Sequence, residues 1–210
     1  MRAGTGRVAR ASLALASRTM QPLLVTGFEP FGAHRVNPSE RVVRALSGRA
    51  GLVAAVLPVS YRRAEERLRA LLEATEPRAL LMLGLAAGSA IRLEHVARNL
   101  DEAGDCDEDG EARAGRPISV SAPAGYESTL PLEAFAAALA RVSLPVDWSR
   151  DAGGFLCNHV FYRAREWVEQ RGLGIPCGFV HLPPLEALAL ERQIEGVGAC
   201  LAVLATSSGT

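Results

Sequence analysis

The stretch RALLMLGL, residues 78–85, carries the strongest indication of the fold. Every residue after its arginine is apolar, and the run is only long enough for a strand. Strands that read as continuous apolar runs are typical of parallel sheets covered by helices, because neither side of such a strand faces water. We therefore expect this segment to lie inside a sheet of the α/β type.

On either side, the sequence alternates between short apolar runs and amphipathic stretches of helix length. Other strands are expected at residues 22–27, 51–59, 144–149 and 177–183, with a further extended segment at 89–99. Helices are expected at residues 38–46, 61–77, 130–142, 157–170 and 184–206. This alternation favours one α/β domain over residues 20–210, a three-layer α/β/α sandwich around a mostly parallel twisted sheet.

The first of these helices has a recognisable start signal. Asn37 is expected as its N-cap, Pro38 as the first helical residue and Glu40 as the third. An Asn side chain can accept a hydrogen bond from a free backbone N–H of the first turn, and proline has no N–H to satisfy there.

The composition excludes several classes of partner. The chain has 210 residues, is 49% hydrophobic, and carries 23 basic and 23 acidic residues, for a formal net charge of zero. The chain therefore has no excess of positive charge that would attract nucleic acid or an anionic membrane. No run of apolar residues reaches the ~20 that a membrane span needs. The four cysteines form no C-x-x-C pair, so we expect no metal site or redox dithiol and a cytoplasmic location.

Residues 1–19 differ from the rest of the chain, with four arginines and no acidic residue. They could form a targeting segment, although their apolar run is short for a signal peptide. We favour a disordered extension that precedes a functional start at Met20.

Residues 101–117 are acidic and contain glycine, so we expect a solvated loop there. Its "DCDEDG" at residues 105–110 resembles the start of a helix–loop–helix calcium loop. That loop needs Glu at its twelfth position, where this chain has Arg116, so we expect no calcium site.

Candidate chemistry lies at the predicted strand ends, where α/β folds bind ligands. Cys157 follows two glycines in the first turn of a predicted helix, where free N–H groups and the helix dipole would lower a thiol pKa and bind an oxyanion. His181 ends the next strand, and a right-handed connection would place that strand beside the one before Cys157. His159 lies only two residues from Cys157 on the helix, so the two side chains do not face each other, and we interpret it as structural.

A thiol and an imidazole are the minimum for cysteine nucleophilic catalysis, and Glu94 is a candidate third member that would orient the ring. Each residue alone has a simpler interpretation. Cys157 could be an inert buried cysteine, His181 a hydrogen-bonded core residue and Glu94 a solvent-facing strand residue.

Five segments, in order, resemble the pyroglutamyl peptidase I family of cysteine peptidases. They are LLVTGFEPFG with NPS (residues 23–32 and 37–39), LEHVARNLDEA (93–103), YESTLP (126–131), GGFLCNHVFY (153–162) and GFVHLPPL (178–185). The resemblance covers the chain from about Leu23 to the C-terminal helix. It implies a three-layer α/β/α fold, a thiol protease active without metal or cofactor, and often a dimer or tetramer.

The resemblance further implies a Cys157–His181–Glu94 triad that removes N-terminal pyroglutamyl residues from peptides. The flat, neutral lactam ring would lie between Phe28 and Phe31. Phe155, Leu156 and Leu85 would complete an apolar wall, which suits such a ring.

The sequence departs from the family around this site. Leu85 replaces a common Gln or Glu, and Ser89 stands near a usual arginine. Gly104 occupies a position where many bacterial members have an arginine thought to help at the oxyanion. Three hypotheses remain open. The chain is a pyroglutamyl peptidase with altered loops, a related cysteine amidohydrolase with another small acyl substrate, or a homologue with little turnover that acts as a binding protein.

Overall fold

The computed structural model describes residues 21–32 and 35–206, so the extension expected at residues 1–19 lies outside the described residues. The main sheet has six strands in the order β2-β1-β3-β8-β4-β7. These are β1 (Leu23–Phe28), β2 (Leu52–Leu57), β3 (Ala79–Leu85), β4 (Ile91–Glu94), β7 (Val146–Ser149) and β8 (Cys177–Leu182). The helices are α2 (Pro38–Leu46), α3 (Tyr61–Thr75), α4 (Leu132–Arg141), α5 (Leu156–Gln170) and α6 (Leu190–Thr206).

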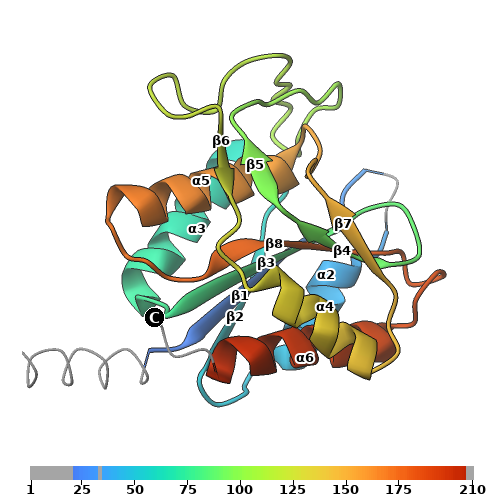
Figure 1. Cartoon of the computed structure of the whole chain (residues 1–210). Helices are drawn as coiled ribbons and strands as arrows, with labels where there is room; N and C mark the ends of the chain where they lie inside the picture. The colour runs from blue at the N-terminus through green and yellow to red at the C-terminus, as the bar shows by residue number, and fades with distance from the viewer. Residues whose placement is uncertain (1–20, 33–34, 207–210) are drawn as a thin grey trace, which may run out of the picture.

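Helices cover both faces of the main sheet (Figure 1). α3 and α5 lie on one face, and α2, α4 and α6 lie on the other. Each face has its own apolar core, and the strands contribute alternate side chains to the two cores. The predicted three-layer α/β/α sandwich is confirmed.

β3 lies inside the sheet, between β1 and β8 and parallel to both. Leu81 and Leu83 point into the core of α2, α4 and α6, whereas Leu80 and Met82 point into the core of α3 and α5. The continuous apolar run thus reflects a strand with no face in water, as the sequence predicts.

The first four strands in this order, β2, β1, β3 and β8, are parallel to one another, but the rest of the sheet departs from this pattern. β4 pairs antiparallel with β8, and the edge strand β7 then pairs parallel with β4. The expected extended segment at residues 89–99 is split at His95. Beyond this residue, β5 (Val96–Arg98) leaves the sheet and pairs with β6 (Gly125–Glu127), a strand that the sequence did not predict. This two-stranded ribbon packs against α5.

The start of α2 follows the sequence prediction. Asn37 is its N-cap and accepts a hydrogen bond from the Ser39 backbone N–H at 3.1 Å, and Pro38 opens the helix. The Ser39 hydroxyl in turn accepts a bond from the Phe28 N–H at 3.0 Å. The cap therefore also fixes the end of β1, where the opening loop begins.

The C-terminal helix begins later than expected, at Leu190 instead of Pro184. The N–H groups of Ala187 and Leu188 both bond to the Pro184 carbonyl, which closes a separate turn. The Gln193 side-chain amide then donates to the carbonyls of Pro183 and Leu188, at 2.9 and 2.8 Å. Residues 184–189 are thereby held outside the helix.

The large apolar side chains at residues 198–206 are mostly buried in the core of the protein. Cys200, Leu201 and Leu204 are buried in the core shared by α2, α4 and α6. Its outward side chains include Ala202 and Ala205, which are small.

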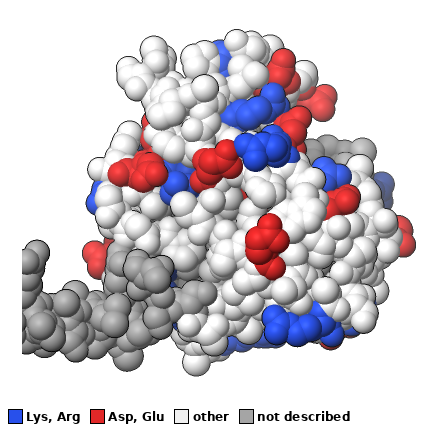
Figure 2. Space-filling view, in the orientation of Figure 1, with Lys and Arg blue, Asp and Glu red and all other residues white. Residues whose placement is uncertain are grey.

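Arginines and acidic side chains lie next to one another on the upper part of the visible face, and no large area there has a single sign (Figure 2). Within the described part of the chain, no helix is long and apolar enough to cross a membrane.

Candidate active site

Two glycines bring the chain to the start of α5. Gly153 has φ +85°, a left-handed conformation that favours glycine. A Cβ on Gly154 would lie 3.0 Å from the backbone of Glu102, and the Glu102 N–H bonds to the Gly154 carbonyl at 2.9 Å. The pair of glycines therefore lets residues 153–155 lie against the loop after β5, which places Cys157 in the first turn of the helix.

Asn158, which the sequence analysis did not single out, fixes this turn. Its side chain accepts from the Arg98 N–H at 2.8 Å and donates to the carbonyls of Arg98 and Leu100, both at 2.9 Å. Asn158 is fully buried. Three hydrogen bonds thus tie the residue after Cys157 to the end of β5 and the loop that follows it. The only sequence signal for this role was the place of Asn158 beside the cysteine.

The Cys157 thiol lies directly over Gly84 in β3. A Cβ on Gly84 would be 2.7 Å from Cys157 Sγ and 2.8 Å from the Phe179 ring, so no larger residue fits. Gly84 is paired in register with His181 on β8. Neighbouring strands are about 4.8 Å apart, so the thiol and the imidazole occupy adjacent positions on one face of the sheet. The isolated glycine in an apolar strand could have signalled this close approach.

His181 and Glu94 form a buried pair on the same face. His181 Nδ1 lies 2.8 Å from Glu94 Oε1, and the two residues are 4% and 0% exposed. Glu94 Oε2 has no hydrogen-bond partner among the described residues. The structure therefore brings Cys157, His181 and Glu94 together. Among the described residues, the His181 imidazole is the one hydrogen-bond partner of the Glu94 carboxylate.

The route to this arrangement differs from the one expected. The strand before Cys157, β7, is not beside β8, because β4 lies between them and runs antiparallel to β8. Cys157 reaches His181 from α5, which crosses over β3, and β4 brings Glu94 to the other side of the histidine.

The expected lowering of the Cys157 pKa is wrong for the free protein. Burial raises the pKa of this thiol to about 12, and the nearby negative charge of Glu94 acts in the same direction. The bond from its own backbone N–H lowers the pKa but is outweighed. Cys157 is thus a protonated thiol at neutral pH and needs a base beside it to become a nucleophile.

Aromatic rings lie beside the thiol on the β1 side. Phe28 is buried at the end of β1, in the core of α3 and α5. The rings of Phe31 and Phe155 are tilted, with centroids 5.9 Å apart, and Phe155 meets the Tyr61 ring edge-on at 5.5 Å. The aromatic side chains expected near the nucleophile therefore cluster at one side of it.

The other predicted wall residues lie further back. Leu156 is 2% exposed and packs in the core of α3 and α5. Leu85 follows Gly84, so strand alternation directs it to the opposite face of the sheet. There it lines a separate cavity of about 270 Å³ with Val36, Pro38 and Leu185. Ser89 and Gly104 are both exposed.

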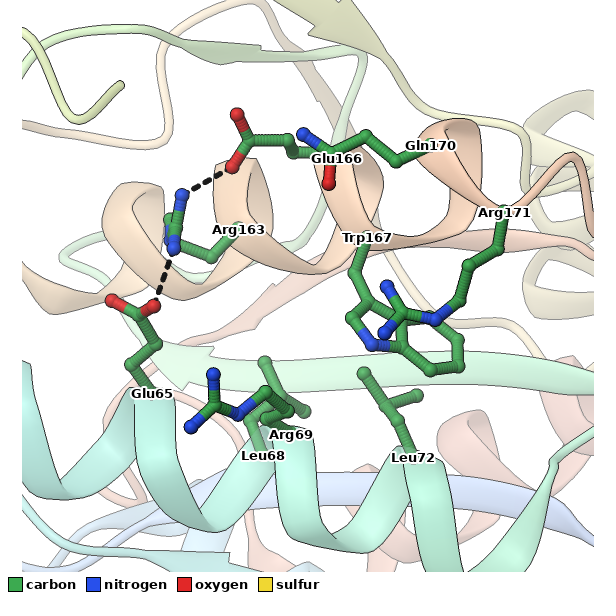
Figure 3. Close-up of a pocket in the computed structure, with 9 residues that line it drawn as sticks. All are labelled: Glu65, Leu68, Arg69, Leu72, Arg163, Glu166, Trp167, Gln170 and Arg171. Atoms are coloured by element: carbon green, nitrogen blue, oxygen red, sulfur yellow. Dashed lines mark hydrogen bonds and ion pairs between the residues drawn. The ribbon is translucent and has the colours of Figure 1, made fainter. Parts of the chain in front are cut away.

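The second histidine of α5 belongs to a different cluster. His159 Nδ1 lies 3.0 Å from Asp101 Oδ2, which also accepts a hydrogen bond from Arg113 at 3.0 Å. His159 Nε2 is 3.5 Å from Glu65 on α3. From Glu65 the ion pairs continue through Arg163 to Glu166, beside a cavity between α3 and α5 (Figure 3).

The acidic loop is less solvated than expected. Asp101 is fully buried in the cluster just described, and Asp107 is only 6% exposed. Asp107 accepts hydrogen bonds from the backbone N–H groups of Tyr61, Asp109 and Glu111. Its carboxylate therefore folds the loop against α3. Among the described residues no group of three or more His, Cys, Asp or Glu side chains could hold a metal ion.

The chain matches the family model of pyroglutamyl peptidase over residues 21–205. A pyrrolidone-carboxylate peptidase of Deinococcus radiodurans is 40% identical over 178 residues, which are 81% of this chain and 82% of that protein. A pyrrolidone-carboxylate peptidase of Pyrococcus furiosus is 38% identical over 179 residues, 83% and 86% of the two chains.

Solved structures agree with the sequence matches. The crystal structure of pyroglutamyl peptidase I from Bacillus amyloliquefaciens superimposes with a TM-score of 0.84 at 30% identity, covering 90% of this chain and 98% of that one. A pyrrolidone carboxyl peptidase from Thermococcus litoralis gives a TM-score of 0.83 at 31% identity, covering 88% and 93%.

Proposed function

The chain belongs to the pyroglutamyl peptidase family of cysteine peptidases, and on that premise we propose that it removes N-terminal pyroglutamyl residues from peptides with Cys157 as nucleophile. One observation carries the assignment of the site. Cys157 Sγ lies over Gly84, whose neighbour in register is His181, and His181 is hydrogen-bonded to the buried Glu94.

The proposed first step is attack by Cys157 on the pyroglutamyl carbonyl. Because the pKa of the thiol is raised to about 12, the thiol must lose its proton as it attacks. With Nδ1–H donating to Glu94, His181 has Nε2 free to accept that proton. The sulfur–carbon bond forms and the carbonyl π pair moves onto oxygen. The N–H groups in the first turn of α5, which has no side-chain cap, would bind that oxyanion.

The remaining steps return the site to its starting state. The imidazolium of His181 gives its proton to the leaving nitrogen, so that the amide bond breaks and the shortened peptide departs as an amine. Water then loses a proton to His181 and attacks the thioester, which releases pyroglutamate and the thiol. Glu94 stabilises the imidazolium in both halves, since its buried charge lies against the ring.

The lactam ring is proposed to bind on the aromatic side of the nucleophile. Phe31 and Phe155 would contact its faces, with Phe28 beneath them and Leu156 supporting the wall from behind. Leu85, which the sequence analysis included in this wall, lies on the opposite face of the sheet and takes no part in it. Support comes from the 5.9 Å contact between the Phe31 and Phe155 rings beside the start of α5. A small neutral ring gains from apolar walls without needing a counter-charge.

We further propose that the protein acts in the cytoplasm, as a homo-oligomer, without metal or cofactor. All four cysteines are free, which supports a reducing compartment. The large apolar side chains of α6 are used in the core, so they give no specific support to the oligomer.

The test is hydrolysis of a fluorogenic pyroglutamyl amide by the wild-type protein and by Cys157→Ala, with prolyl and alanyl amides as comparison substrates. Release from the pyroglutamyl amide by wild type only would support the proposal. Release from another acyl amide instead would favour the related amidohydrolase. A folded wild type inert on all three substrates would favour the binding protein.

A further inference from the structure

Arg92 lies beside the candidate active site and has no role so far. It is paired in register with His181 across the antiparallel β4–β8 contact. Ile91 and Leu93 point into the core of α2, α4 and α6, so Arg92 points to the opposite face, with Glu94 and His181. Residues directly opposite each other in such a pair have Cβ atoms about 4.5–5.5 Å apart. The arginine is therefore a neighbour of the imidazole.

The Arg92 guanidinium has unused hydrogen-bonding capacity. Its Nη2 donates to the Ala87 carbonyl at 2.9 Å, which is the hydrogen bond the described residues give it. No carboxylate of the described part of the chain lies within ion-pair distance of it, and the side chain is half-buried. A guanidinium has five N–H donors in a planar fork that matches a carboxylate. An uncompensated arginine at the rim of a site is thus suited to bind an anion.

The order of the strands indicates how a bound substrate would be oriented across the sheet. One row of residues crosses the sheet from β1 to β4. It consists of Phe28, Gly84 under the thiol, His181 and Arg92. If the pyroglutamyl ring lies at the aromatic end, the leaving nitrogen lies toward His181, which must protonate it. The leaving residue then extends toward β4. Its α-carbon is one bond and its carboxyl carbon two bonds beyond that nitrogen, which is within the reach of Arg92.

We infer that Arg92 binds the free α-carboxylate of the residue after pyroglutamate, so that the enzyme prefers pyroglutamyl dipeptides to amidated or longer peptides. This rests on the proposed function and adds the class of substrate. In a longer or amidated peptide the same position is a neutral amide. Such a substrate loses a charge-assisted bond, which corresponds to about tenfold to a hundredfold in kcat/KM.

The experiment compares kcat/KM for pyroglutamyl-alanine and pyroglutamyl-alaninamide, with the released alanine or alaninamide quantified by chromatography. Wild type, Arg92→Gln and Arg92→Lys are measured with Arg69→Gln as the matched control. Arg69 lies on α3 and lines the cavity between α3 and α5 (Figure 3). Like Arg92, it has no ion pair within the described residues. We expect wild type and Arg69→Gln to prefer the free acid at least about tenfold. In Arg92→Gln the ratio should fall to about one, and Arg92→Lys should restore part of it.

Two results would overturn the inference while leaving the proposed activity intact. One is equal kcat/KM for the two substrates in wild type. The other is an equal loss on both substrates in Arg92→Gln, which would mean that the arginine only supports the loop at Ala87. Hydrolysis of neither compound by a folded wild type would overturn the proposed function itself, and the inference with it.

Discussion

The described part of the chain contains two buried histidine–carboxylate pairs, and only one of these two has the surroundings of a catalytic group. His181–Glu94 and His159–Asp101 both join Nδ1 to a carboxylate, at 2.8 and 3.0 Å, and all four residues are nearly inaccessible. The pairs differ at the second ring nitrogen. The Nε2 atom of His159 faces another carboxylate, on Glu65, whereas the ring of His181 neighbours a thiol.

The charges around the two rings also differ. Burial opposes a charge on His159, but Asp101 and Glu65 outweigh it, and the pKa of His159 is raised. Arg113 pairs with Asp101 and stacks on the Tyr61 ring at 4.2 Å. The two carboxylates thus favour the protonated form of His159. A base must lose and regain its proton in each turnover. The second neighbour of the ring, and not the histidine–carboxylate pair itself, therefore decides the role of each histidine.

The largest effect should come from changing the carboxylate of the first pair. In Glu94→Gln the neutral amide cannot stabilise the imidazolium of His181. We expect kcat on a pyroglutamyl amide to fall about 10²–10⁴-fold, as expected when a triad carboxylate loses its charge. The measurement is steady-state hydrolysis across pH 6–9. Retention of kcat within tenfold would mean that Glu94 is not the orienting group.

The same chemical change in the second pair should act on stability instead. Asp101→Asn leaves His159 and the partly buried Arg113 guanidinium without the carboxylate that they share. Breaking a buried ion pair on one side costs about 3–5 kcal/mol, and Arg113 keeps Glu111, so we expect a loss of about 2–4 kcal/mol in the free energy of unfolding.

Urea unfolding measures that loss, and kcat/KM for the same protein should remain within about threefold of wild type, since the cluster touches no proposed reacting atom. The two substitutions form a matched set, because each turns a histidine-bound carboxylate into an amide. The comparison between the pairs would break if Asp101→Asn reduced turnover as strongly as Glu94→Gln while leaving the unfolding free energy unchanged.

The sequence was sufficient for the features that depend on local chemistry. The apolar run of β3, the Asn37 cap and the position of His181, rather than His159, beside Cys157 follow from strand burial, capping geometry and helix periodicity. The catalytic role of His181 stays a prediction. Glu94 came from the resemblance as much as from its setting, because an isolated acid in an extended segment has no distinctive local signal.

The predictions that were wrong concern features that depend on contacts between distant segments. The antiparallel insertion of β4 cannot be read from four residues, because register is set by partners far away in sequence. The predicted direction of the Cys157 pKa shift was wrong because burial of the thiol over Gly84 outweighs its position at the helix start. The extra turn before α6 needed the Gln193 side chain, which lies inside the helix it delimits.

The smallest expected effect concerns the pH dependence of the second pair. The contact with His159, together with Arg163, lowers the pKa of Glu65 from 4.5 to about 2. A lowered carboxyl pKa contributes stability above about pH 4.5, which is lost as the pH falls toward about 2. His159, with its raised pKa, contributes stability below its unfolded value of about 6.5, which is lost as the pH rises through the folded value. The contact is therefore strongest between about pH 4.5 and 6.5.

Glu65→Gln should remove this dependence. The difference in unfolding free energy between wild type and the variant should peak near pH 5.5, at about 1–2 kcal/mol once solvent screening of the one-third exposed Glu65 is allowed for, and should shrink at pH 3 and pH 9. Glu66→Gln is the matched control, because its exposed pair with Arg62 should give a difference near zero at every pH. A difference for Glu65→Gln that stays constant from pH 3 to 9 would mean that His159 is neutral.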